Sequence, residues 1–158
     1  RYFNAAGAEP FNFDLGQAPE ATHLVARALE ASIAGRAITI NGSDFDTEDG
    51  TCVRDYVHVW DIARAHVLGA SYMLDDYPQD GAHVYNLGTG RGTSNTEIVN
   101  YVNEKYKLPF VNYGPPRKGD PATLVASAQR ARYHLAWEPL FSDTATIVDS
   151  AYKWYVRK

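Results

Sequence analysis

The sequence has little of several features that are typical of disulfide-bonded, metal-binding and membrane proteins. Its one cysteine, Cys52, cannot form an internal disulfide or a cysteine-based metal site, so we expect a free structural thiol and a reducing compartment. Its five histidines lack paired metal-binding spacing, which predicts that there is no metal site. No apolar run approaches the roughly 18 residues that span a bilayer, and no charged-then-apolar leader opens the sequence. We therefore expect a soluble, cytoplasmic protein without a membrane partner.

An excess of positive charge is also missing. The 158 residues carry a net charge of -4, and the pI is about 5.7. Proteins that bind nucleic acids or anionic membranes usually have a clustered basic face, so we expect a small-molecule partner and no nucleic acid. The length suits one compact domain with a core of its own.

Apolar periodicity predicts a mixture of helices and short strands. Helical spacing covers residues 24–33, 62–73, 95–106, 127–135 and 143–156. Strand-like runs cover residues 1–3, 37–41, 53–59, 84–87 and 110–113. Ser94 and Glu97 match a capping box, and Asp61 is expected to cap the helix after it. The predicted fold class is α/β, with too few strands for a complete doubly wound sheet.

One motif resembles a dinucleotide-binding loop and another resembles a catalytic Tyr-Lys pair, but we interpret both as structural. Gly88, Gly90 and Gly92 follow a strand and precede a capped helix, but their spacing departs from the dinucleotide fingerprint, so we interpret them as a βα turn. Tyr101 and Lys105 have the Tyr-x-x-x-Lys spacing that places a phenol and an ammonium on one helix face. We interpret this pair as a half-buried tyrosine beside a solvated lysine. The sequence thus offers no catalytic residue.

Two arginines are placed to bind an anion. Arg54 follows an acidic, glycine-containing segment and precedes Tyr56, and Arg117 lies between a double proline and Asp120. Guanidinium groups match phosphate oxygens, and a carboxylate such as that of Asp120 suits ribose hydroxyls. Either arginine alone would more often form a surface ion pair. The further matches described next favour a shared anion site.

Several segments together resemble the UDP-galactose 4-epimerases, a branch of the extended short-chain dehydrogenase/reductase family. The similar segments are residues 1–8, 41–51, 53–59, 85–90, 117–120 and 137–139. The resemblance implies UDP-glucose and UDP-galactose as substrates and NAD as cofactor. It implies that a hydride leaves the sugar C4, the keto sugar turns over, and the hydride returns to the opposite face.

The resemblance also implies that residues 1–158 form one substrate-binding region, the C-terminal part of such an enzyme without most of its Rossmann domain. Strands near residues 1–4 and 84–87 would then join the Rossmann sheet. The family's catalytic serine or threonine, tyrosine and lysine match nothing in the sequence, so we expect a fragment that is inactive alone. Because family dimers pair through helices that also match nothing here, no family-type dimer is expected.

Positions of the sequence can be matched one by one to the family's ligand contacts. Tyr2 and Phe3 match positions near the nicotinamide. His23 stands where asparagine is frequent, Asn41 stands where an aromatic ring often covers the uracil, and Leu124 stands where a tyrosine in some members excludes N-acetylated sugars. The positions that match UDP-sugar contacts are Asn4, His23, Leu24, Thr39, Asn41, Arg54, Tyr56, Arg117, Asp120 and Leu124.

In this match Arg54 is expected to face the diphosphate and Tyr56 the sugar. The sequence leaves two alternatives open. One is a stand-alone module that binds nucleotide sugars without catalysis, and the other is the same half of a related UDP-sugar epimerase or dehydratase. Which sugar is preferred does not follow from the sequence.

Overall fold

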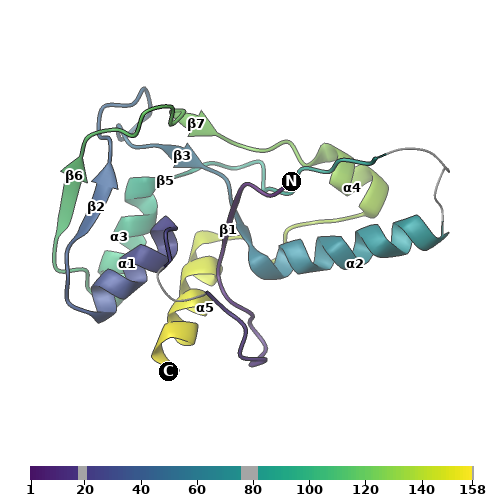
Figure 1. Cartoon of the computed structure of the whole chain (residues 1–158), viewed down its shortest axis with the longest axis horizontal. Coiled ribbons are helices and arrows are strands. Elements are labelled where there is room, and N and C mark those ends of the chain that lie inside the picture. The colour runs from purple at the N-terminus through teal and green to yellow at the C-terminus, as the bar shows by residue number, and fades with distance from the viewer. Residues whose placement is uncertain (18–20, 76–81, 158) are drawn as a thin grey trace.

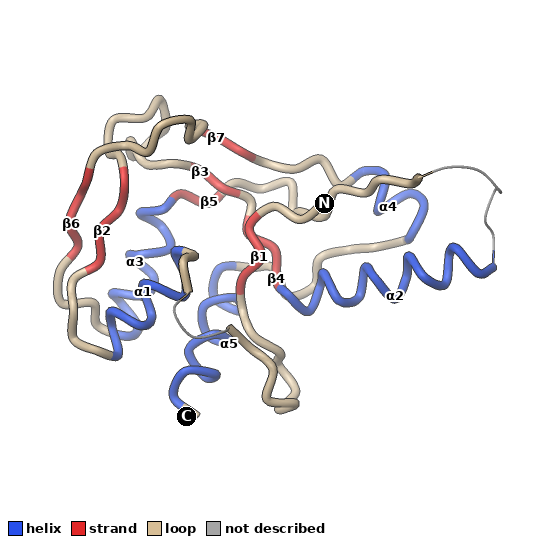
Figure 2. Tube along the Cα trace, in the orientation of Figure 1, coloured by secondary structure: helices blue, strands red, loops and turns tan. Residues whose placement is uncertain are grey.

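Short strands, most of them in parallel pairs, form the frame of the structure. The computed structural model describes residues 1–17, 21–75 and 82–157. Strand β1 (Asn4–Ala6) pairs in parallel with β4 (Tyr56–His58), and β2 (Ile38–Asn41) pairs in parallel with β6 (Val111–Gly114). Strand β3 (Val53–Arg54) lies between β5 (Thr93–Ser94) and β7 (Thr123–Leu124). Much of the chain between these strands is loop (Figure 2).

Helices pack around this frame in two groups, as Figure 1 shows. The first group lies beside β2 and β6 and consists of α1 (Leu24–Ile33), α3 (Asn95–Tyr106) and α5 (Thr144–Val156). The second group, α2 (Val59–Asp75) and α4 (Gln129–Leu135), extends away on the other side of β1 and β4. The predicted mixed α/β class is confirmed.

Each group of helices has its own apolar core. Leu29, Ile98 and Ile147 are fully buried where α1, α3 and α5 meet. Trp137 and Ala131 are fully buried in the second core, beneath α2 and α4. Strands β1 and β4 run between the two cores and contribute to both, because neighbouring residues of a strand face opposite sides. These two strands also place Asn4 and Tyr56 beside each other.

Most predicted elements are present, and most of their boundaries shift by at most two residues. The first strand, however, lies at Asn4–Ala6 and not at residues 1–3, and α2 begins three residues earlier than predicted. The capping box at the start of α3 is confirmed: the Ser94 hydroxyl accepts from the Glu97 amide, and the Glu97 carboxylate accepts from the Ser94 amide. Residues 84–87 do not form the regular strand that we expected; a parallel bridge joins Tyr2 and Leu87, and Arg1 exchanges hydrogen bonds with Tyr85 and Leu87. The expected pairing of this segment with a Rossmann sheet stays a prediction.

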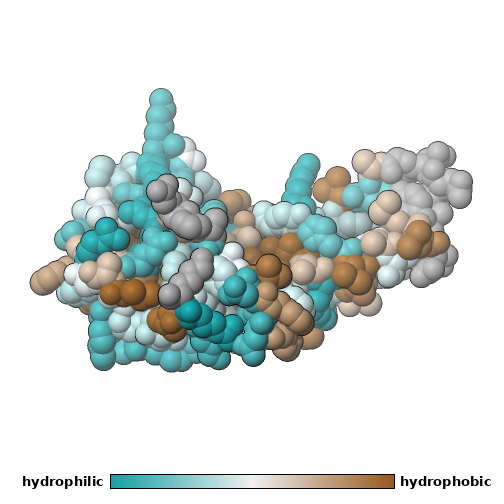
Figure 3. All heavy atoms as spheres, turned by 60° about the horizontal axis from the view of Figure 1, so that its bottom comes forward, coloured by the Kyte–Doolittle hydropathy of each residue, from teal (hydrophilic) through white to brown (hydrophobic). Residues whose placement is uncertain are grey.

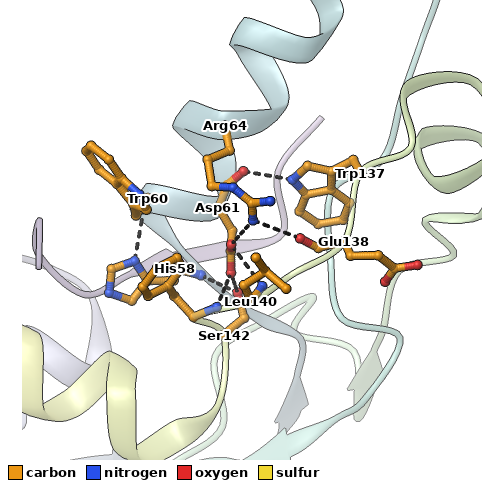
Figure 4. Close-up of polar contacts among 9 residues, drawn as sticks. His58, Trp60, Asp61, Arg64, Trp137, Glu138, Leu140 and Ser142 are labelled. Carbon is orange, nitrogen blue, oxygen red and sulfur yellow. Dashed lines mark hydrogen bonds and ion pairs between the residues drawn. The ribbon is translucent and has the colours of Figure 1, made fainter.

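The expectation that Asp61 caps a helix is also wrong. Helix α2 begins at Val59, directly after β4, so Asp61 lies inside its first turn. The carboxylate of Asp61 is fully buried and accepts from the amides of Leu140 and Phe141, at 2.9 and 2.8 Å. Arg64 donates to the same carboxylate at 3.0 Å, and the Asp61 carbonyl accepts from the Trp137 indole at 2.8 Å (Figure 4). Asp61 therefore joins α2 to the segment that leads into α5.

Apolar side chains are exposed along α2 and α4. Val67, Met73, Leu74 and Tyr133 are each exposed over more than half of their surface. Figure 3 shows hydrophobic surface along this part of the molecule. Within the described ranges, no helix is both long and apolar enough to cross a bilayer.

Candidate functional site

One cavity gathers most of the residues predicted to bind the substrate. It has a volume of about 250 Å³ and lies where β1, the first turn of α1, β2 and the segment around Arg117 meet. Nine of the ten positions matched to UDP-sugar contacts line it, from segments far apart in the sequence. They are Asn4, His23, Leu24, Thr39, Asn41, Arg54, Tyr56, Arg117 and Asp120.

Arg54 is fixed by backbone acceptors at the wall of this cavity. Its Nη1 donates to the carbonyl oxygens of Val53, at 2.9 Å, and Pro121, at 2.7 Å. Its Nη2 lies 3.8 Å from the Asp120 carboxylate, and only 12% of the arginine side chain is exposed. A largely buried guanidinium with one weak acidic partner keeps most of its positive charge available to a bound anion.

Asn4 and Tyr56 lie opposite each other at another wall of the cavity. They are register partners in the parallel pair of β1 and β4. Burial raises the pKa of the Tyr56 phenol, so Tyr56 is neutral and its hydroxyl can both donate and accept a hydrogen bond. Together with the Asn4 amide, this hydroxyl suits a neutral polyhydroxyl ligand rather than a second anion.

Cys52 also lines the cavity, immediately before the strand that carries Arg54. It is buried and free, in agreement with the expected unpaired thiol. Burial raises the pKa of the Cys52 thiol, so the thiol stays protonated at neutral pH. A protonated, buried thiol is a poor nucleophile, which favours a packing role.

The Asp55 carboxylate accepts hydrogen bonds from the backbone amides of the glycine turn. The fully buried Asp55 carboxylate accepts from the Thr89 amide at 2.8 Å, the Gly90 amide at 3.0 Å and the Ala126 amide at 3.1 Å. These donors are therefore not free to bind a phosphate. The turn after Leu87 acts as structure, and Asp55 holds it against the strand that carries Arg54.

Three predicted contacts lie outside this cavity. Leu124 is 44% exposed on β7, beside Arg54 in the sheet, but does not line the cavity. Tyr2 faces a second, apolar groove of about 570 Å³ between α2 and residues 82–87, where its hydroxyl donates to His66 Nε2 at 3.0 Å. Phe3 lines neither space. The proposed sugar and nicotinamide contacts of these residues remain predictions.

The cavity contains polar residues that the sequence analysis missed. Arg27 lies on α1 three residues after Leu24, a spacing that places both on one face of the helix. Asn95 is the first residue of α3 and lines the cavity near Cys52. The helical spacing from Leu24 could have predicted that Arg27 also lines the cavity. For Asn95 nothing in the local sequence distinguished a lining residue from an ordinary helix start.

The Tyr-x-x-x-Lys pair has a structural role. The Tyr101 hydroxyl donates to Asp149 of α5 at 3.1 Å, and Lys105 donates to the other oxygen of the same carboxylate at 2.5 Å. Tyr106 donates to Asp149 as well, at 2.7 Å. The motif therefore links α3 to α5, away from the cavity. Tyr101 is half-buried as expected, but Lys105 forms an ion pair with Asp149 and is not simply solvated.

Comparison with known proteins gives a consistent result. The family model of the NAD dependent epimerase/dehydratase family matches residues 1–88. A UDP-glucose 4-epimerase of Rhizobium meliloti is 44% identical over 163 aligned residues, which cover 100% of this chain and 48% of that protein. A UDP-glucose 4-epimerase of Halalkalibacterium halodurans is 40% identical, covering 98% of this chain and 46% of that protein.

Solved structures agree with the sequence relatives. A crystal structure of a UDP-glucose 4-epimerase superposes with a TM-score of 0.90 at 39% identity, covering 100% of this chain and 48% of the other. The enzyme of Bifidobacterium longum, solved in complex with NAD+ and UDP, superposes with a TM-score of 0.86 at 32% identity, covering 100% of this chain and 47% of the other. The chain thus spans about half the length of the relatives it matches. By sequence and by structure, the chain belongs to the NAD dependent epimerase/dehydratase family.

Proposed function

We propose that this chain forms the UDP-sugar-binding part of a UDP-glucose 4-epimerase that interconverts UDP-glucose and UDP-galactose. The observation that carries the proposal is the cavity that brings together three guanidinium groups, a carboxylate and a neutral phenol from distant segments. This is the set of groups that a nucleoside diphosphate joined to a neutral sugar requires.

In this proposal each group has a separate task. Arg54 holds a diphosphate oxygen, because its guanidinium is oriented by backbone carbonyls and largely shielded from water. Asp120 is 37% exposed and accepts from ribose hydroxyls. Tyr56 and Asn4 contact the sugar, and they do so without charge, which lets a keto sugar turn over between two hydride transfers.

NAD is the cofactor that the family implies, and the described residues do not fit the whole dinucleotide. Its pyrophosphate needs free amide donors at a glycine turn, whereas the amides of Thr89 and Gly90 already bind Asp55. Tyr2 and Phe3 are proposed only for the nicotinamide end. We therefore assign this chain substrate binding and orientation, and we assign no hydride step to its residues.

A binding titration tests the proposal. We expect the isolated chain to bind UDP with a dissociation constant of millimolar order, because two charge-assisted contacts of about 1.5–3 kcal/mol each roughly match the ~4 kcal/mol of such a complex. Arg54→Ala removes one contact and should weaken UDP about tenfold or more. Arg36→Ala, an exposed arginine just after α1 that does not line the cavity, is the matched control and should change nothing.

The outcome that would contradict the proposal is equally specific. Binding of NAD without binding of UDP, measured by the same calorimetric titration, would remove the assignment of Arg54 and of the cavity. Loss of UDP binding in Arg36→Ala as large as in Arg54→Ala would show that only overall charge matters.

A stand-alone nucleotide-sugar binding module is the second candidate. Such a module would use the same cavity residues for binding and would need no group that transfers a hydride. The two candidates differ in turnover: the natural full-length protein should convert UDP-galactose in the presence of NAD if it is an epimerase, and should only bind it if it is a module.

Leu124 bears on the choice of sugar. Its side chain is smaller than a tyrosine and 44% exposed beside Arg54, so a bulky 2-substituent meets less obstruction there. We propose that the full-length protein also accepts UDP-N-acetylglucosamine. An absence of turnover with that substrate, in an assay where UDP-glucose reacts, would remove this proposal.

A further inference from the structure

We propose that Asp55 is a positioning residue for UDP binding, and that it acts on Arg54 from behind the wall of the cavity. The inference rests on the proposed function and deepens it, because it says what keeps the Arg54 guanidinium in its binding position. Asp55 is fully buried and does not line the cavity, whereas its neighbours Arg54 and Tyr56 do. Residues two apart in an extended segment face one side, so Asp55 faces the side opposite to the ligand.

The Asp55 carboxylate is bound to two other segments of the chain. Its Oδ1 accepts from the Thr89 amide at 2.8 Å and from the Thr89 hydroxyl at 2.7 Å. Its Oδ2 accepts from the Gly90 amide at 3.0 Å and from the Ala126 amide at 3.1 Å. No lysine or arginine of the described residues forms an ion pair with Asp55. The carboxylate therefore depends on neutral donors from the glycine turn and from the segment after β7.

The glycine turn is shaped to receive this carboxylate. A Cβ at Gly88 would lie 2.6 Å from the Asp55 Oδ2 and 2.5 Å from the Ala126 Cβ. Any side chain at residue 88 would therefore push the turn away from Asp55, and glycine is the residue that allows such a close approach. The glycine motif thus has a structural explanation, because it lets the turn reach Asp55.

The backbone of Asp55 binds two further strands. Its amide donates to the Leu124 carbonyl of β7 at 3.1 Å, and its carbonyl accepts from the Asn4 amide of β1 at 2.9 Å. Asp55 therefore joins β1, β7 and the glycine turn at the point of the chain that lies between Arg54 and Tyr56.

The connection from Asp55 to the Arg54 guanidinium runs through residues 121–126. At the start of this segment, the Pro121 carbonyl accepts from Arg54 Nη1 at 2.7 Å. At its end, the Ala126 amide donates to Asp55. Loss of the Ala126 contact would release that end, and the Pro121 carbonyl that orients the guanidinium would gain freedom. An arginine that is oriented before binding loses less conformational freedom when the ligand arrives, so its contact contributes more affinity.

The test compares variants of the chain by NMR titration with UDP. Asp55→Asn replaces an acceptor oxygen with a donor that faces the amides, and Thr89→Val removes only the hydroxyl donor. We expect UDP to bind about fivefold more weakly to Asp55→Asn and about two- to threefold more weakly to Thr89→Val, because Arg54 must then be ordered on binding. Ser142→Ala is the matched control for Thr89→Val. The Ser142 hydroxyl also donates to a buried carboxylate at 2.7 Å, that of Asp61, and its loss should leave UDP binding unchanged.

Two further readouts separate positioning from a general loss of structure. Nitrogen relaxation of the Arg54 Nε–H group should show a more mobile side chain in Asp55→Asn and Thr89→Val, and an unchanged one in Ser142→Ala. In an Arg54→Ala background, Asp55→Asn should weaken UDP by less than about twofold, because the group through which Asp55 acts is already absent. Circular dichroism identifies the folded variants. If Asp55→Asn does not fold, Thr89→Val and Ser142→Ala decide the question by the same measurements.

The outcomes separate this inference from the proposed function. The inference is overturned if UDP affinity and Arg54 mobility in the folded variants equal those of Ser142→Ala. It is also overturned if Asp55→Asn or Thr89→Val weakens UDP by the same factor with and without Arg54. In both cases the unmodified chain still binds UDP, and the proposed function stands. If the unmodified chain binds no UDP, both are overturned.

Discussion

Asp55 and Asp61 are buried carboxylates that bind backbone amides of the chain itself. Asp55 lies between Arg54 and Tyr56 of the cavity wall, and both carboxylates are fully buried. Each receives several hydrogen bonds from segments distant in sequence, so each behaves as an internal ligand around which loops are ordered. The arginines of the cavity have the opposite arrangement, because their charge is left available to a ligand.

Replacing Asp61 tests this role. Asp61→Asn exchanges an acceptor for an amide donor, which then faces the amide donors of Leu140 and Phe141 and the Arg64 guanidinium. We expect the free energy of unfolding to fall by about 3–5 kcal/mol, the usual effect of removing one partner from a buried charged pair. Urea unfolding followed by circular dichroism measures it.

Asp44→Asn is the control for that measurement. Asp44 is exposed in the loop between β2 and β3, and its replacement should change stability by less than about 0.5 kcal/mol. Equal effects of the two substitutions would mean that the buried carboxylate has no special role in the fold.

At the scale of an element, the start of α3 depends on more than its own sequence. The Ser94 hydroxyl accepts from the Glu97 amide inside the helix and donates to the Asp49 carboxylate at 2.5 Å. Asp49 in turn accepts from the amide and the hydroxyl of Thr51. One hydroxyl therefore caps the helix and also anchors the acidic loop that precedes Arg54.

We therefore expect Ser94→Ala to lower the free energy of unfolding by more than the loss of an ordinary helix cap does. A lost cap costs about 0.5–2 kcal/mol, and we expect the upper end of that range because the Asp49 contact is lost with it. Thermal unfolding measures the change. Ser71→Ala, at an exposed interior position of α2, should be neutral or slightly stabilising, because alanine has the higher helix propensity. A neutral Ser94→Ala would contradict the double role.

At the scale of the whole molecule, His58 is one of the residues that tie the two cores together. It is fully buried on β4, its amide donates to Ser142, and its Nδ1 accepts from the Trp60 amide at 3.0 Å. Nε2 must then carry the proton and donate to Ser150 of α5, at 3.0 Å. Burial lowers the pKa of His58, although the Asp61 and Asp143 carboxylates oppose this shift.

This arrangement predicts how stability depends on pH. The folded pKa of His58 lies below its ordinary value of about 6.5, so the unfolded chain binds more protons between those two values. The stabilising contribution is therefore complete above about pH 6.5 and is lost as the pH falls below it. The free energy of unfolding should decline there by at most about 1.4 kcal/mol per pH unit for one proton.

Chemical denaturation at a series of pH values checks this expectation. His58→Gln removes the titrating group and should flatten the profile between pH 7 and 5, although it lowers stability at every pH. A profile of the natural sequence that is already flat in that interval would refute the assignment to His58.

The sequence by itself determined the elements and the family resemblance. Apolar spacing predicted α1, α3 and α5, and local side-chain pairs such as Ser94 and Glu97 predicted where α3 begins. The match to the family also identified nine of the residues that line the cavity, because a ligand site imposes residue types that survive as local patterns. Such signals lie within a few residues of one another, so the sequence alone reveals them.

Only the tertiary structure decided which groups remain free to act. From the sequence, Asp61 resembled a helix cap, and no pattern paired Arg117 with Asn41. The fold brings Asp61 against Leu140 and Phe141, and Arg117 against Asn41, across long stretches of chain. The physical reason is that a polar group's availability depends on the donors and acceptors that folding places beside it, and these come from segments whose approach no local pattern encodes.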